Sequence, residues 1–238
     1  MEGKTRPLGF APASQAKSSP LLLVGQLPRG QLDKVDLAIS QQVDALLVFP
    51  EDVQAVSEAL HRLKELRPSW GVWLSEKVPE NLGKLIELGC EFIVFGPETS
   101  AGLLGEEKFG RVLLVEPSLA DGLAQATGKL PIDAVLLSEE VKPPLTIGQL
   151  MNYQRLLALI GKPSLFSLTG EAGARELEAL CGVGFRAIVV HLGQQSAKKL
   201  ASLRKTVGSL KIPKRKAGKA GALLPAVELP EELIEEEI

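Results

Sequence analysis

A single closed (β/α)8 barrel, of the class called TIM barrels, is the fold that this chain predicts, and three observations support it. Short, continuously apolar runs recur at intervals of roughly 20 to 30 residues, each followed by a helix-like segment. They do not alternate apolar with polar residues, which is typical of parallel strands buried on both faces. The 238-residue length also suits one such barrel. The runs are 21–25, 44–50, 70–75, 91–96, 111–116, 133–138, 164–170 and 186–193.

Segments between the runs carry helical periodicity. In 52–66, apolar residues fall on one face at spacings of three and four. Segment 146–161 opens on Thr146, a capping residue, and closes on Gly161, a common helix stop. We also expect helices over 172–184 and 195–210, and a very short one within the glycine-containing segment 99–110.

Eight β–α units favour closure of the sheet over the alternative, an open doubly wound sheet, because no run has the polar character of an edge strand. A weak internal similarity points the same way. DALLVFPE (44–51) resembles DAVLLSEE (133–140), and GCEFIVFG (89–96) resembles GFRAIVVH (184–191). In each pair, the sequence offset between the two segments is close to the length of half a barrel, which mildly supports repeated units.

Composition excludes several classes of partner. The net charge of −2 predicts no nucleic-acid or anionic-membrane binding, and no apolar run reaches the roughly 20 residues that span a bilayer. The N-terminus lacks a secretory pattern, so we expect a cytoplasmic protein. The two cysteines, Cys90 and Cys181, belong to no CxxC motif, and we interpret both as packing residues.

The chain divides into an extension (1–20), the barrel (21–210) and a charged tail (211–238). The tail begins with a basic block and ends with a glutamate-rich one, so we expect it to be disordered. A second interpretation is that the tail binds a protein partner. A homodimer through helical faces is also compatible with a barrel.

Chemistry in such barrels is placed at the carboxyl ends of the strands. There the chain has many carboxylates and few cations. The eight runs contain no lysine for Schiff-base chemistry, and the two histidines are too few for the metal sites of amidohydrolases. No dinucleotide fingerprint or P-loop is present. We predict no metal site and leave any cofactor unknown, although Glu51, Glu98, Glu139 and Glu171 are possible oxygen ligands for a divalent cation.

His191 is the best candidate for a catalytic residue, because an imidazole at a strand end exchanges protons near neutral pH. Glu116, at the end of the run 111–116, is its predicted companion. The structural alternative is that both are ordinary rim residues, since carboxylates after strands often stabilise helix starts.

The loops TGEAG (169–173) and LGQQS (192–196) follow the seventh and eighth runs, where helix N-termini can hold an anion. In this outline the chain resembles the phosphate-binding barrels of ribulose-phosphate, tryptophan-biosynthesis and thiamine-phosphate enzymes. The resemblance implies an anion site made by Gly170, Glu171, Gly193 and Gln194. Its glycine motifs are eroded: Thr169-Gly170 replaces Gly-Gly, and His191-Leu192 replaces Gly-Ser.

Two functions follow from these features. The first is a lyase, isomerase or decarboxylase-like enzyme acting on a small anionic, phosphorylated metabolite. The second is a barrel without catalysis that serves as a binding or scaffold protein, with the tail contacting the partner. Fold alone does not choose between them.

Overall fold

A computed structural model describes residues 20–31, 33–49, 54, 69–74 and 82–210. Eight parallel strands pair in sequence order, and β1 closes the barrel by pairing with β8. The fold is therefore the predicted (β/α)8 barrel, and the open sheet is excluded. The strands are β1 Leu22–Gln26, β2 Ala45–Val48, β3 Ser69–Trp73, β4 Phe92–Phe95, β5 Gly110–Val115, β6 Ala134–Val141, β7 Ser164–Leu168 and β8 Phe185–His191.

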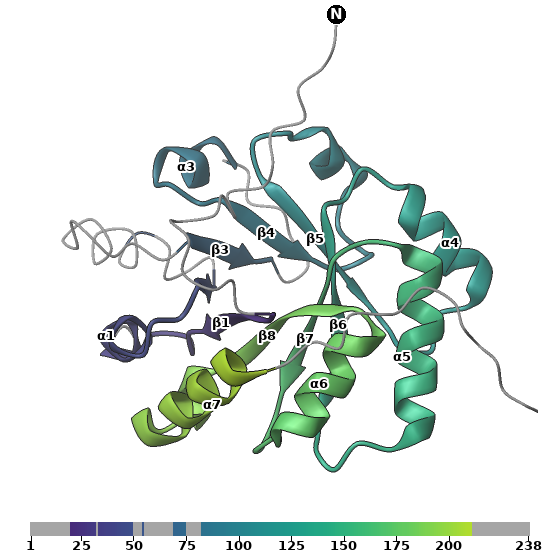
Figure 1. The fold of residues 1–238 in the computed structure, drawn as a ribbon. Helices are drawn as coiled ribbons and strands as arrows, with labels where there is room; N and C mark the ends of the chain where they lie inside the picture. Colours follow the sequence, from purple (N-terminus) through teal and green to yellow (C-terminus); the bar gives the residue numbers. More distant parts are fainter. Residues whose placement is uncertain (1–19, 32, 50–53, 55–68, 75–81, 211–238) are drawn as a thin grey trace, which may run out of the picture.

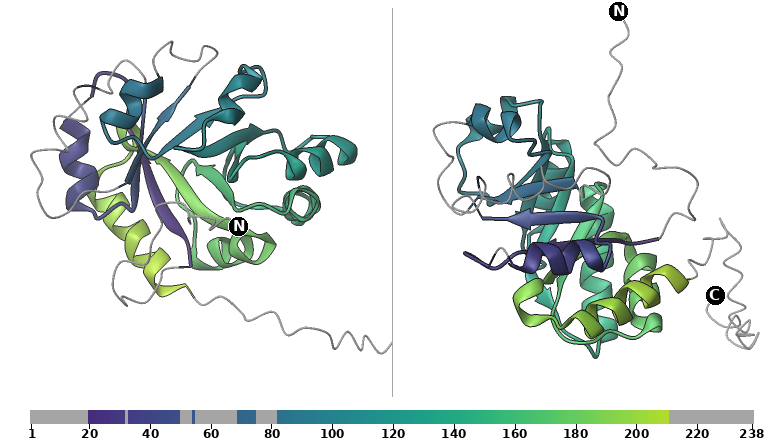
Figure 2. Two further views of the ribbon diagram at one scale, coloured as in Figure 1. Left: turned by 90° about the horizontal axis from the view of Figure 1, so that it is seen from above. Right: turned by 90° about the vertical axis from the view of Figure 1, so that its left-hand side faces the viewer.

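Helices surround the strands, as Figures 1 and 2 show. They are α1 Asp33–Ser40, α3 Leu82–Glu87, α4 Asp121–Lys129, α5 Ile147–Ile160, α6 Ala174–Val183 and α7 Ala197–Ser209, with the 3₁₀ turns η2 Ala101–Gly105 and η3 Leu192–Gln194. No helix of these described ranges is long and apolar enough to cross a membrane. The helix expected over 52–66 (except Gln54), residues 1–19 of the extension 1–20 and the tail 211–238 lie outside the described residues.

Helix α5 shows how local sequence sets the ends of an element. The Thr146 side chain accepts a hydrogen bond from the backbone N–H of Gln149, and the Gln149 side chain accepts one from the backbone N–H of Thr146. This reciprocal capping box satisfies amides that the first helical turn leaves free. Gly161 ends the helix at φ 66°, a left-handed conformation that glycine adopts without steric cost. The predicted helix and both of its ends are confirmed.

The core has two apolar layers. One fills the barrel interior with Val24, Ala45, Leu47, Phe92, Val94, Val112, Ala134, Leu136, Ala187 and Val189. The other lies between the strands and the helices and includes both cysteines. Burial raises the pKa of the Cys90 thiol to about 12 and also raises that of Cys181, so both are un-ionised packing residues as expected.

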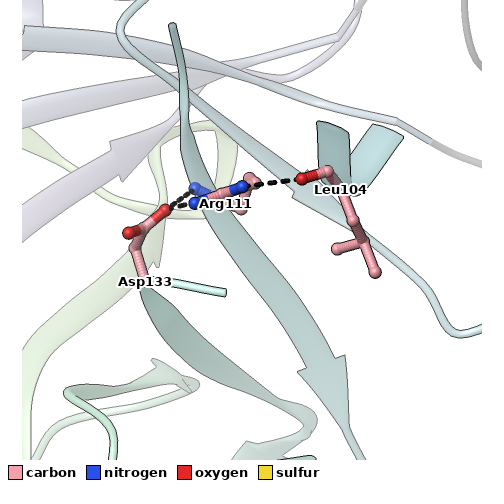
Figure 3. A network of polar contacts seen from close by, with 3 residues as sticks. All are labelled: Leu104, Arg111 and Asp133. Carbon is pink, nitrogen blue, oxygen red and sulfur yellow. Dashed lines mark hydrogen bonds and ion pairs between the residues drawn. The ribbon is translucent and has the colours of Figure 1, made fainter. Parts of the chain in front are cut away.

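Two aspartates half a barrel apart perform the same structural task. Asp44 precedes β2 and accepts a hydrogen bond from the backbone N–H of Leu23 at 2.7 Å; Asp133 precedes β6 and accepts one from Arg111 at 2.8 Å. Each carboxylate also binds a guanidinium. Arg204 of α7 reaches Asp44 with two nitrogens, and Arg111 Nε lies 3.2 Å from Asp133 while its Nη1 donates to the Leu104 carbonyl oxygen (Figure 3). The similarity between 44–51 and 133–140 thus has a structural counterpart.

Candidate active site at the barrel mouth

Strand β6 extends further than its apolar run predicted. Leu136 pairs with Leu165 of β7, but the next pair joins Glu140 to Ser167, so three residues lie between these positions on β6 and one on β7. The additional residues, Ser138 and Glu139, are exposed. This irregularity returns Glu140 to the sheet at the carboxyl end of the barrel, which is a common role of β-bulges.

Glu140 connects the ends of three neighbouring strands. Its Oε1 lies 3.2 Å from Nε2 of His191 at the end of β8, and its Oε2 accepts a hydrogen bond of 2.6 Å from the Thr169 hydroxyl after β7. The Thr169 hydrogen bond, and then the charges of His191 and Lys142, lower the pKa of Glu140 from its ordinary value against the opposing effect of burial. The carboxylate is therefore ionised at neutral pH and holds the imidazole in a fixed orientation.

The side chains that line the mouth divide into a polar and an apolar half. Inner-face positions on β6, β7, β8 and β1 carry Glu140, Ser167, His191 and Gln26. On the opposite side, the inner cluster and the partly buried side chains packed against it are apolar, including Leu47, Trp73, Val94 and Leu114. The carboxyl end of the barrel therefore carries hydrogen-bonding groups on one side and hydrocarbon on the other.

Glu116, the predicted companion of His191, lies just past β5, three strands away from β8 around the barrel. It is exposed and accepts a hydrogen bond of 3.3 Å from the Ser118 hydroxyl. The carboxylate in contact with His191 is Glu140. The sixth predicted run ends at residue 138, two positions before Glu140, so the sequence offered no sign that Glu140, and not Glu116, would meet the imidazole.

The predicted anion-binding residues separate into two groups. Gly170 and Glu171 line a surface pocket of about 410 Å³ between the β7–α6 loop and α7. Gly193 lies in η3, and a side chain there would come within 2.6 Å of Pro28, so this glycine is required by packing against the β1–α1 loop. The neighbouring Leu192 is fully buried and packs over Gly25. Gln194 is exposed at the end of η3.

The pocket also contains two lysines that the residues at the strand ends did not predict, because these lysines belong to helix α7. Lys198 and Lys199 line it together with Gln195, Ser196, Ser202 and Thr206. Lys199 Nζ lies 3.3 Å from Oε1 of Glu171, and both side chains are largely exposed. The pocket therefore carries two ammonium groups against one carboxylate, next to the N-terminus of α7.

No group of three or more potential metal-ligating His, Cys, Asp or Glu side chains occurs within the described ranges. Glu98, Glu139 and Glu171, which the sequence suggested as possible oxygen ligands, are not brought together there. Glu51 lies outside these ranges.

The geometry defines a TIM barrel with a polar, partly acidic mouth and a basic pocket beside it. No family model and no curated protein matches the chain. Solved structures match its fold. Tryptophan synthase from M. tuberculosis aligns with a TM-score of 0.59 at 14% identity, covering 80% of this chain and 93% of that one.

Two further matches have the same character. Thiamine phosphate pyrophosphorylase from Pyrococcus furiosus has a TM-score of 0.58 at 14% identity, covering 79% of this chain and 96% of that one. Phosphoribosyl anthranilate isomerase from Thermus thermophilus has a TM-score of 0.58 at 18% identity, covering 80% of this chain and 100% of that one. The resemblance to phosphate-binding barrels is thus confirmed as a likeness of fold, without assigning a specific family.

Proposed function

We propose that this protein is an enzyme of the lyase or isomerase kind that transfers a proton on a small anionic, phosphorylated metabolite. The observation that carries the proposal is the Glu140–His191 pair, oriented by Thr169 at the carboxyl end of a closed barrel. Side chains in this position act in TIM-barrel enzymes. Two of the aligned proteins have phosphate compounds in their names, which supports the choice of ligand class.

His191 is the proton-transfer group in this proposal. Because Nε2 faces a carboxylate, the contact favours a proton on Nε2 and leaves Nδ1 as the atom that accepts a proton from the ligand. The imidazolium formed in that step is stabilised by the ionised Glu140. Glu140 acts through His191, as a positioning residue. Glu116 stays a second possible companion, with no contact to His191 supporting it.

The anion is proposed to bind between the β7–α6 loop and α7. Gly170 follows Thr169 directly, so the basic pocket begins one residue from the group that orients Glu140. Lys198, Lys199 and the Ser196 hydroxyl offer positive charge and hydrogen bonds to a phosphate, near a helix N-terminus that favours anions. The backbone amides of Gly170, Glu171, Gly193 and Gln194 are further proposed donors to this phosphate.

A specific observation favours the second function, a binding or scaffold barrel. Buried Leu192 fills the position at which the phosphate-binding barrels have the second residue of their Gly-Ser pair. A protein partner through the tail 211–238 and homodimer formation belong to this alternative. A cytosolic setting without nucleic-acid partners is proposed for either function, and the two free cysteines suit a reducing compartment.

Titration with inorganic phosphate, followed by thermal unfolding, tests the anion pocket. We expect phosphate to raise the Tm of the wild type. Lys199→Gln should weaken binding about three- to tenfold because it removes a positive charge, whereas Glu171→Gln should tighten it by a similar factor because a competing carboxylate disappears. Lys129→Gln, an exposed lysine at the end of α4, is the matched control. Equal phosphate affinity in all four proteins contradicts this assignment.

A further inference from the structure

The most unusual polar group at the mouth is the carboxamide of Gln26. This residue ends β1 and is only 6% exposed. Its Oε1 is buried and accepts no hydrogen bond from any described residue. Buried polar atoms in native proteins nearly always have partners, because an unpaired one retains the full cost of its lost hydration. An unpaired carbonyl oxygen next to a candidate site therefore requires an explanation.

Strand geometry places this amide on the inner face of the barrel. Side chains alternate between the faces of a strand, and Val24, two residues earlier, belongs to the inner cluster. Gln26 pairs in register with His191 of β8 on one side and with Leu47 of β2 on the other. Gln26 and His191 are thus register partners at the carboxyl ends of two adjacent strands.

Below the ends of these two strands the barrel interior is closed by hydrocarbon. Val24 and Val189, two residues before Gln26 and His191, belong to the apolar cluster that fills it, and both are at least 97% buried. A hydrogen-bond partner for Gln26 therefore has to arrive from the mouth, which is also the side from which a ligand reaches His191.

We infer that Gln26 is a specificity-determining residue that binds a hydroxyl group of the ligand. This inference rests on the proposed function, because it adds a hydroxyl requirement to the same phosphorylated metabolite. A carboxamide both accepts and donates hydrogen bonds, and a hydroxyl does the same, so one hydroxyl satisfies Oε1. A carboxylate ligand group has no proton to give to Oε1. An ammonium group would lose its hydration without meeting an opposite charge on Gln26. The ligand class is a hydroxylated metabolite of the polyol-phosphate or sugar-phosphate kind.

The substitution Gln26→Met tests this assignment, since methionine keeps the length of the side chain and removes its polar atoms. Without ligand, we expect a Tm equal to that of the wild type or higher by about 2 to 4 °C, because a buried unpaired amide is removed. Tyr153→Phe is the matched control. The Tyr153 hydroxyl is also buried without a partner among the described residues, but its ring packs against Phe185 in the layer outside the barrel.

Binding is then measured by calorimetry with three probes: glycerol 3-phosphate, propyl phosphate and ribitol. Wild type and Tyr153→Phe should bind glycerol 3-phosphate about five- to tenfold more tightly than propyl phosphate, which has no hydroxyl. In Gln26→Met this preference should vanish, while propyl phosphate binds as before.

Other results separate the two proposals. Ribitol binding to the wild type but not to Gln26→Met, without binding of either phosphate, overturns the anion proposal and supports the role of Gln26. An equal preference for glycerol 3-phosphate in all three proteins overturns that role and leaves the anion site standing. A lower Tm of unliganded Gln26→Met also overturns it, because the amide would then have a structural partner. No binding of any probe to the wild type overturns both.

Discussion

Replacing Gly71 with alanine should strongly destabilise the barrel. A Cβ atom at this position of β3 would lie 2.4 Å from both the Phe92 ring and the Phe92 carbonyl oxygen. The ring belongs to the packed interior and the carbonyl to the neighbouring strand, so neither moves without disturbing the β3–β4 pairing. We expect a loss of about 3 kcal/mol in the free energy of unfolding, at the upper end of overpacking costs.

Urea denaturation followed by circular dichroism measures this loss, and Gly182→Ala is the matched control. Gly182 lies in α6 with nothing within 4 Å of the added methyl group. Alanine favours a helix, so this variant should gain about 0.5 to 1 kcal/mol. A Gly71→Ala protein as stable as the wild type would show that the Phe92 ring does not lie against β3.

Replacing His191 with glutamine should lower catalysed proton exchange by a factor of about 10² to 10⁴, the usual contribution of a general acid or base. The assay follows deuterium incorporation from D₂O into a panel of phosphorylated aldoses and ketoses by NMR.

Glu140→Gln should lower the rate about tenfold or more, because His191 loses the carboxylate that orients it. The same change at Glu116 should cost less than about threefold. A larger effect at Glu116 than at Glu140 contradicts the assignment of the companion, and wild-type exchange no faster than buffer contradicts catalysis.

Replacing Thr169 with valine should raise the pKa of Glu140. The Thr169 hydroxyl is the main cause of the lowered pKa of Glu140, whose ordinary value is 4.5. A lowered pKa in the folded state means that the ionised form stabilises the site above pH 4.5, and this contribution is lost as the pH falls through the lower, folded-state pKa. In Thr169→Val the pKa of Glu140 should return towards 4.5, so the midpoint of its carboxyl titration, followed by ¹³C NMR, should move to higher pH. An unchanged midpoint would show that the Thr169 hydroxyl does not bind this carboxylate.

The fold could be predicted in advance because its signals are local and repeated. Strands buried on both faces are apolar throughout. Helix α5 has its start signal at Thr146 and its stop signal at Gly161. What local patterns missed was the last part of β6. Ser138 was the last residue of the predicted run, and Glu139 and Glu140 followed it as polar residues. In the structure Ser138 and Glu139 form an exposed irregularity, and Glu140 returns to the sheet.

The site was predicted in part for the same reason. His191 stands at the end of an apolar run, so its position at the mouth followed from the strand. Its contact with Glu140 depends on the register between β6 and β7, and that register is set by tertiary packing. Lys198 and Lys199 lie in α7, and only the folded chain brings them against Gly170 and Glu171. Gln26 directly follows the predicted run 21–25, but a missing hydrogen bond is recognised only in three dimensions.

NMR observation of the His191 ring during titration with glycerol 3-phosphate tests the account most directly, because the chain has only two histidines and His191→Gln assigns the signal. If the polar mouth and the basic pocket form one site, the ring signals should shift saturably, with the same Kd as the backbone amides of Lys198 and Lys199. Amide shifts at the two lysines with an unchanged His191 ring would show that the phosphate binds away from the imidazole and would contradict the proposed active site.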